Sequence, residues 1–177
     1  MFDGSSYEGS LVGGIQQGFG KLIFADGSIF IGEFLNGGVS NGEYIYANGD
    51  HYKGEMKNNS KHGYGIFTTK NSSIEGEFEY NIPVGEIIMT YPDGTTEEGN
   101  INFPDSYNGT VKITYPSGAI YEGEYTNGYE NGQGVLTLSD GSRYEGEFIQ
   151  GHVGYATYTG INGERYEGEF IDGLLNG

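Results

Sequence analysis

The chain has 177 residues, a length that predicts one domain of ordinary size. Glycine supplies 34 of them, and 25 acidic against 8 basic side chains give a formal net charge of −17. This charge argues against nucleic acid as a partner, because such binding depends on lysines and arginines that neutralise phosphates. With no cysteine, the chain has no disulfide framework, thiolate nucleophile or cysteine-based zinc site. Its 16 Tyr and 10 Phe are too many for a flexible linker, so we expect an ordered chain.

A five-residue unit recurs along the chain: a large side chain, a spacer, glycine, a second spacer and another large side chain. The eight copies begin at Tyr7, Phe30, Tyr52, Ile74, Glu97, Tyr121, Tyr144 and Tyr166. Their central glycines are 22 to 24 residues apart. A period of this length is typical of an array of repeated structural units.

Each repeat also contains a Gly-x-Gly segment that leads through two large side chains into Asp-Gly or Asn-Gly, as from Gly18 to Gly27. In two copies proline opens this turn, at Pro92 and Pro116. Proline requires φ near −65°, which excludes type I′ and II′ turns and predicts a type I turn closed by a glycine bulge. The shorter copy at Lys70-Asn71 predicts a two-residue turn. Each repeat is therefore predicted to be a β-hairpin.

The turn type sets which residues face one another and so divides the side chains between two faces. In the first complete hairpin Leu22 is opposite Phe30 and Gly20 is opposite Gly32, which predicts an aromatic face. Opposed glycines leave space there, and we expect an aromatic ring from the adjacent hairpin to cover it. The other face is polar, and the same register places Glu43 opposite Lys53 and Lys112 opposite Glu122.

This pattern resembles the MORN repeat family (membrane occupation and recognition nexus), whose unit runs Tyr-x-Gly-x-Trp/Phe, then Gly-x-Gly, then Asp-Gly. The resemblance implies an all-β fold: an elongated, twisted, single-layer antiparallel sheet of about seven consecutive hairpins, with no catalytic machinery. The sequence departs from the family unit at Ile74 and Glu97, which stand in the tyrosine position. We therefore expect the array to be irregular between about Ile74 and Pro104.

The organisation follows from the repeats. We expect one array over 1–177, made of a half-repeat at 1–17 and seven hairpin repeats at 18–177, with about fifteen strands. The chain ends before a further Gly-x-Gly strand, which predicts that it belongs to a longer protein or that its ends pair with another chain.

No catalytic, cofactor or metal site is predicted. The histidines His51, His62 and His152 lie in different copies and are interpreted as surface residues, although metal or base roles are conceivable. The glutamate pairs recur in nearly every copy, which favours a structural ladder over an acid and base pair.

Two sets of residues are candidates for partner binding. An aromatic strip that accepts a protein segment would comprise Tyr44, Tyr46, Tyr52, Tyr115, Tyr121, Tyr144, Tyr158 and Tyr166. The other interpretation of these rings is that the sheet buries them. A candidate phosphate or lipid patch would comprise Lys53, Lys57, Lys61 and Lys70, half of the basic residues within about one repeat. The alternative interpretation is that these lysines are ordinary solvated charges in loops.

The function predicted first is a non-enzymatic scaffold that presents the aromatic face to a protein segment or to a second copy of the chain. The alternatives are a membrane-tethering module that binds phosphoinositides, and an accessory targeting domain of an enzyme outside this chain, as the family resemblance implies for lipid kinases and SET-type methyltransferases. A cytoplasmic location is expected, with membrane or cytoskeletal association left open.

Overall fold

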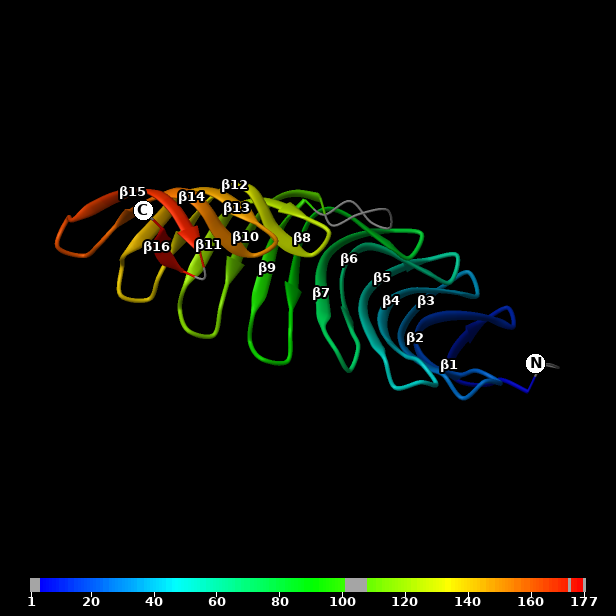
Figure 1. Ribbon diagram of the computed structural model, residues 1–177. Coiled ribbons are helices and arrows are strands. Elements are labelled where there is room, and N and C mark those ends of the chain that lie inside the picture. Colours follow the sequence, from blue (N-terminus) through cyan, green and yellow to red (C-terminus); the bar gives the residue numbers. More distant parts are fainter. Residues whose placement is uncertain (1–3, 101–107, 172, 177) are drawn as a thin grey trace. The chain divides into compact units, whose positions relative to one another are not determined.

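The computed structural model describes residues 4–100, 108–171 and 173–176, and these form sixteen β-strands. The strands are β1 (Ser6–Val12), β2 (Ile15–Ile23), β3 (Ile29–Leu35), β4 (Gly38–Ile45), β5 (His51–Lys57), β6 (Ser60–Thr68), β7 (Ser73–Glu79), β8 (Ile82–Thr90), β9 (Thr96–Asn100), β10 (Asn108–Thr114), β11 (Ile120–Thr126), β12 (Tyr129–Thr137), β13 (Arg143–Ile149), β14 (His152–Thr159), β15 (Arg165–Ile171) and β16 (Leu174–Asn176). They make one open antiparallel sheet in chain order, so each strand lies beside its sequence neighbours (Figure 1).

The fold class is confirmed, and two details of the prediction change. About fifteen strands were expected, and the structure has sixteen, because β16 pairs back onto β15 through Leu174 and Leu175. The irregularity predicted after Ile74 is not found in the pairing of β8 with β9, which keeps a continuous register from Glu86 to Thr90. The rest of that stretch, which includes Asn102–Asp105, lies outside the described residues.

The hairpin turns have the predicted chemistry. At the first, the Gly27 N–H donates to the Phe24 carbonyl at 3.0 Å, and the Phe24 N–H donates to the Ser28 carbonyl at 2.9 Å. Gly27 has a φ of 87°, the glycine bulge that closes a type I turn. Asp26 fixes the loop by accepting bonds from the Ser28 N–H and hydroxyl, and these bonds lower the pKa of its carboxyl. The turn at Lys70-Asn71 is the predicted two-residue turn, closed by a bond from the Thr69 N–H to the Ser72 carbonyl.

At the other end of the strands, two-residue turns connect consecutive hairpins. Both central residues have positive φ, as in type I′ turns: Asn36 and Gly37 have 51° and 84°, and Asn58 and Asn59 have 51° and 60°. Such turns match the right-handed twist of the strands that they join. Asn-Gly and Asn-Asn supply the conformation at little steric cost.

The chain divides into two compact units, Met1–Val84 and Gly85–Gly177, which we call the first and second units. In the first, the predicted register is confirmed: Leu22 pairs with Phe30, and Glu43 pairs with Lys53. Glycines occupy the same level on seven successive strands, β1 to β7. This glycine row comprises Gly9, Gly20, Gly32, Gly42, Gly54, Gly65 and Gly76.

The second unit has the same kind of row, but larger side chains interrupt it. Its members on β8 to β15 are Ile87, Gly99, Val111, Gly123, Gly134, Gly146, Ala156 and Gly168. The predicted pairing of Lys112 with Glu122 is confirmed here. Val111 and Ile87 flank Gly99 from both sides and are almost fully buried.

Aromatic rings cover the glycine row, as predicted. A Cβ atom at Gly65 would lie 2.6 Å from the Tyr52 ring, and one at Gly134 would lie 2.5 Å from the Tyr121 ring. Each ring lies over the glycine two residues further along its own strand and over that glycine's partner on the next strand. The prediction that the ring comes from the adjacent hairpin is therefore confirmed for Gly65 and Gly134, which open their hairpins, whereas Gly54 is covered by the ring of its own strand.

The same tyrosines also donate hydrogen bonds at a place where the ladder between two strands is irregular. The register shifts after the glycine: the single residue Glu55 of β5 lies opposite three residues of β6, 62–64, and Glu124 of β11 lies opposite three residues of β12, 131–133. The Tyr52 hydroxyl donates to the Glu55 carbonyl at 2.8 Å, and the Tyr121 hydroxyl donates to the Glu124 carbonyl at 2.7 Å. The ring thus fills the gap over the glycines while its hydroxyl satisfies the carbonyl that the bulge releases.

Candidate functional site

The tyrosines predicted to form an accessible strip differ in how far solvent reaches them. Tyr52 and Tyr121 are fully buried, each with 0% of its surface exposed. Burial raises the pKa of each phenol to about 12, so both hydroxyls stay protonated as donors at neutral pH. Their predicted place on an accessible strip is wrong, because these two rings are the ones that fill the glycine row. They belong to the core, in agreement with the alternative interpretation that the sheet buries the rings.

The remaining predicted tyrosines are accessible in part. Tyr44, Tyr46, Tyr115, Tyr144 and Tyr158 are half-buried, and Tyr166 is exposed.

In the first unit, half-buried rings form a continuous series near the hairpin turns. Phe24 lies 5.3 Å from Tyr44 between ring centroids, and Tyr44 lies 4.6 Å from Tyr46. Tyr46 in turn contacts Phe67 edge-on at 5.9 Å. The predicted strip omitted Phe24 and Phe67. Both are large side chains between a Gly-x-Gly segment and the turn that follows it. The recurrence of that position could have identified them.

The second unit carries its own series. Tyr144 lies 5.0 Å from Tyr158, and Tyr158 stacks on Tyr166 at 6.3 Å with an interplanar angle of 27°. Tyr144 also packs edge-on against Phe170 at 5.2 Å. Tyr115 belongs to the same face and donates its hydroxyl to Glu130.

The four predicted lysines do not form one patch. Lys53 and Lys57 are exposed on the polar face of β5, and Lys70 is exposed in its turn. Lys61 lies on the aromatic face, because the turn at Asn58-Asn59 places it opposite Met56. It is 9% exposed, with its Nζ 4.0 Å from the centroid of the Phe67 ring and 5.5 Å from that of Tyr46.

Burial lowers the pKa of the Lys61 ammonium, and Asp50 opposes the shift. This lysine is a cation held among aromatic rings, not part of a phosphate-binding cluster.

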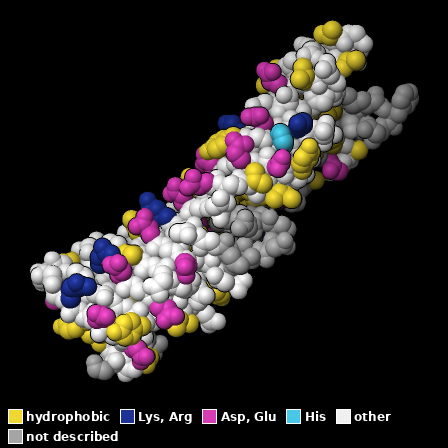
Figure 2. All heavy atoms as spheres, turned by 90° about the horizontal axis from the view of Figure 1, so that it is seen from above, with side chains coloured by type: hydrophobic (Ala, Val, Ile, Leu, Met, Phe, Trp, Pro, Cys, Tyr) yellow, Lys and Arg dark blue, Asp and Glu magenta, His cyan; other side chains and the backbone are white. Residues whose placement is uncertain are grey.

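The polar face carries dispersed charge. Acidic side chains are scattered over the surface seen in Figure 2, with lysines and arginines among them. The ion pairs found among the described residues are His51 with Glu43 at 3.3 Å and Arg143 with Glu145 at 2.6 Å, and all four side chains are exposed. His152 is exposed as predicted, whereas His62 is half-buried beside Tyr80. No group of His, Asp or Glu in the part of the chain described is placed to hold a metal ion.

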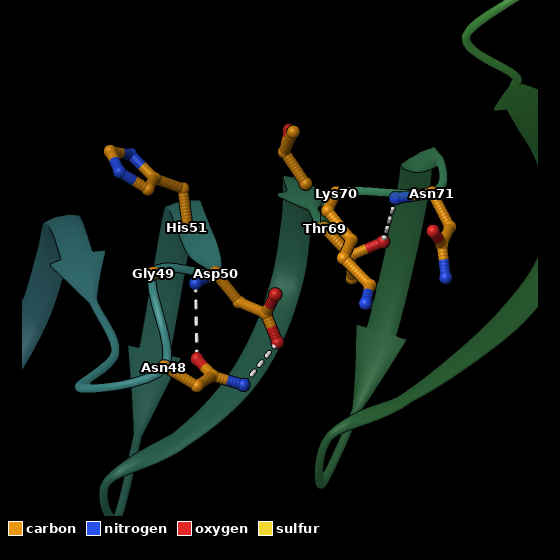
Figure 3. Close-up of a pocket in the computed structure, with 8 residues that line it drawn as sticks. Asn48, Gly49, Asp50, His51, Thr69, Lys70 and Asn71 are labelled. Atoms are coloured by element: carbon orange, nitrogen blue, oxygen red, sulfur yellow. Dashed lines mark hydrogen bonds between the residues drawn. The ribbon is translucent and has the colours of Figure 1, made fainter.

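A depression with a volume of about 580 Å³ lies between two neighbouring turns (Figure 3). Several of its polar groups form hydrogen bonds within their own turn. The Asn48 amide donates to the Asp50 carboxylate at 2.7 Å, and the Asn71 N–H donates to the Thr69 hydroxyl at 3.1 Å. These bonds stabilise the turns, and the side chains do not converge on a common point as those of a ligand site do.

One carboxylate is buried on the aromatic face of the second unit. Glu97 stands where five of the other repeats have tyrosine and is 6% exposed. Its Oε1 accepts a bond from the Tyr125 hydroxyl at 3.0 Å, while its Oε2 is buried without a hydrogen-bond partner. Burial raises the pKa of this carboxyl, and the negative charge of Glu130 adds to the increase, whereas bonds from Tyr125 and Tyr91 oppose it.

The chain belongs to the MORN repeat family. The family profile matches seven segments that together cover most of the chain: 7–29, 30–51, 52–74, 75–96, 121–143, 144–165 and 166–177. The stretch from 97 to 120 lies between two of these segments, and it begins with Glu97. A comparison with curated protein sequences finds no relative.

A solved structure has a similar fold. The TCP domain of SAS-4 (dCPAP) of Drosophila melanogaster, solved in complex with a proline-rich motif of Ana2 (dSTIL), matches with a TM-score of 0.56 and 16% identity. The match covers 86% of this chain and 85% of that domain. The TCP10 domain of Danio rerio CPAP matches with a TM-score of 0.37 and 17% identity, over 94% of this chain and 79% of that one. Among the described residues of the present chain, no helix has the length and apolar character needed to cross a membrane.

Proposed function

We propose that this MORN repeat module is a non-enzymatic scaffold whose half-buried tyrosines bind a proline-rich protein segment. The observation that carries the proposal is the series of partly accessible rings on the aromatic face, formed by Phe24, Tyr44, Tyr46 and Phe67 in the first unit and by Tyr144, Tyr158 and Tyr166 in the second. Grooves lined by aromatic rings are the surfaces on which polyproline II segments dock.

The spacing of the repeats fits such a ligand. Neighbouring strands lie about 4.8 Å apart, so equivalent side chains of successive hairpins are about 9.6 Å apart. A polyproline II helix advances about 9.3 Å in one turn of three residues. A segment that crosses the strands therefore presents the same side of its helix once per repeat. The likeness to a TCP domain solved with a proline-rich motif supports the same choice of ligand.

Binding of a fluorescein-labelled decaproline peptide to the full chain, followed by fluorescence anisotropy, tests the proposal. Tyr46→Ala and Tyr158→Ala should each weaken binding at least tenfold. The matched controls are Tyr64→Ala and Tyr155→Ala, because these tyrosines are 51% and 53% exposed on the polar face. The controls should bind like the unchanged protein.

A glycine-serine peptide of equal length and vesicles containing phosphoinositides complete the experiment. Failure of decaproline to bind, or equal losses in both pairs of variants, would contradict the proposal. Binding to the vesicles alone would favour the membrane-tethering alternative.

A further inference from the structure

The aromatic face of the second unit carries negative charge that no basic residue of that unit balances. Glu97 lies opposite Ile113, and Glu130 lies opposite Tyr125, so both carboxylates are on this face. The basic side chains of the described part of this unit lie elsewhere. Lys112, Arg143 and Arg165 alternate with aromatic-face residues along their strands and so belong to the polar face.

The inner carboxylate is incompletely bonded. Oε1 of Glu97 is held by Tyr125, but Oε2 has no partner in the described part of the chain, although it is buried. A buried carboxylate oxygen without a donor is costly, and a bound group that donates to it removes this cost. Tyr91, Tyr115 and Tyr125 surround the two carboxylates with phenol groups.

Phenol rings and paired carboxylates together favour one chemical class of ligand. A guanidinium or ammonium group is attracted by ring faces and forms strong, charge-assisted bonds with carboxylates. Arginine suits the site best, because its planar group can bond to two acceptors at once.

We infer that Glu97 and Glu130 bind a basic side chain, preferably arginine, carried by the proline-rich segment that occupies the aromatic face. The inference rests on the proposed function and adds a specificity determinant to it. Glu130 is half-buried and is the outer carboxylate, which the incoming group meets first. Glu97 is the inner one, and the incoming group reaches its Oε2 through changes of side-chain rotamer of the kind that binding commonly brings.

The test compares two labelled peptides, a proline decamer with one central arginine and the same decamer with citrulline, the neutral analogue of arginine. The full chain should bind the arginine peptide at least tenfold more tightly than the citrulline peptide. Glu97→Gln should reduce this preference at least fivefold, because it removes the charge while glutamine keeps an acceptor for Tyr125. Glu130→Gln should reduce the preference in the same way.

Glu98→Gln is the matched control, since Glu98 is the next residue of β9, is exposed, and pairs with Lys112 on the polar face. It lowers the net negative charge by the same amount and should leave the preference intact. Equal preferences in Glu97→Gln and Glu98→Gln, or no preference in the unchanged protein, would overturn the inference while leaving the proposed function in place. If neither peptide binds, the proposed function is wrong and the inference fails with it. Should Glu97→Gln fail to fold, Glu130→Gln decides the question.

Discussion

The glycine rows of the two units solve the same packing problem in two ways. In the first unit, seven glycines in succession leave a trough that rings such as Tyr52 fill. In the second unit, Ile87 and Val111 replace the glycines on both sides of Gly99, and the residue that would supply the ring is Glu97. The aromatic ring at the position of Glu97 has thus been replaced by two aliphatic side chains, Ile87 and Val111, on the neighbouring strands.

The exchange shows that the repeat conserves the filling of space over the row and not the identity of the residue that fills it. Close packing tolerates exchanges that conserve total volume. A consequence is that the position of the ring becomes available for a different chemistry. In the second unit a carboxylate occupies it, and this is where the family profile has no match.

The two aromatic faces differ in charge as well. The first unit holds Lys61 among the Phe67 and Tyr46 rings, whereas the second holds Glu97 beneath tyrosine hydroxyls. Each charge is largely removed from water, so each lowers the stability of its unit at neutral pH unless a partner compensates.

The largest effects are expected where a methyl group is added to the glycine row. Gly65→Ala and Gly134→Ala should each destabilise the protein by about 3 kcal/mol, because the new Cβ meets the Tyr52 or Tyr121 ring. Gly168→Ala is the control, since no atom lies within 4 Å of its added Cβ, and it should change stability by less than about 0.5 kcal/mol. Urea denaturation measures all three. A cost at Gly168 equal to the others would show that lost backbone freedom, not ring contact, explains the row.

The exchange in the second unit can be reversed. Glu97→Tyr alone should destabilise the protein by about 2 kcal/mol, because Ile87 and Val111 already occupy the space of the ring. The triple variant combines Glu97→Tyr with Ile87→Gly and Val111→Gly. There the tyrosine should recover part of the stability that the two glycine substitutions remove. The measurement is the coupling free energy from a thermodynamic cycle of urea denaturation curves. Strict additivity of the three changes would mean that the sites are independent and that the comparison is wrong.

Removing the tyrosine hydroxyl tests whether the bulge is supported equally in both units. Tyr52→Phe and Tyr121→Phe each leave a carbonyl opposite the bulge, that of Glu55 or Glu124, without its tyrosine donor and should cost about 1 to 2 kcal/mol. Thermal denaturation should show similar decreases of the melting temperature in both variants. Tyr155→Phe is the control, because its exposed hydroxyl makes only a 3.4 Å contact with Glu167. A decrease in one unit alone would show that water replaces the donor in the other.

The smallest effects concern the two buried charges, and their pH dependences have opposite signs. The pKa of Glu97 is raised above its usual 4.5, so between 4.5 and the raised value the native state holds a proton that the unfolded chain has lost. Glu97 therefore lowers stability as pH rises through that range. The pKa of Lys61 is lowered below its usual 10.5, so deprotonation of Lys61 raises stability as pH rises towards 10.5.

Glu97→Gln and Lys61→Met should each stabilise the protein by about 1 kcal/mol at pH 7. The gain from Glu97→Gln should disappear in acid, where the carboxyl is protonated, and the gain from Lys61→Met should shrink in alkali. Urea denaturation at pH 4, 7 and 10 distinguishes the two. A loss of stability in Lys61→Met at pH 7 would mean that its contacts with the rings outweigh the cost of burial.

Several features of the fold could be predicted because they depend on neighbours in the sequence. Proline at position 92 and glycine at 94 are compatible with one type of turn, and that turn determines the register of the hairpin. The connections between hairpins were equally predictable but were missed: the Asn-Gly pairs at 36–37 and 127–128 are strong signals for type I′ turns. The Asn58-Asn59 turn would also have placed Lys61 on the aromatic face.

The sequence by itself therefore determined the repeat, the turn chemistry, the register and the division into an aromatic and a polar face, because each of these follows from residues a few positions apart. Only the tertiary structure decided which rings are core and which remain accessible. That choice depends on the space left by glycines on a neighbouring strand, and it buries Tyr52 and Tyr121 while leaving Tyr46 and Tyr158 half-buried. The environment of Glu97 was decided in the same way, since its burial and the unpaired Oε2 arise from residues on other strands.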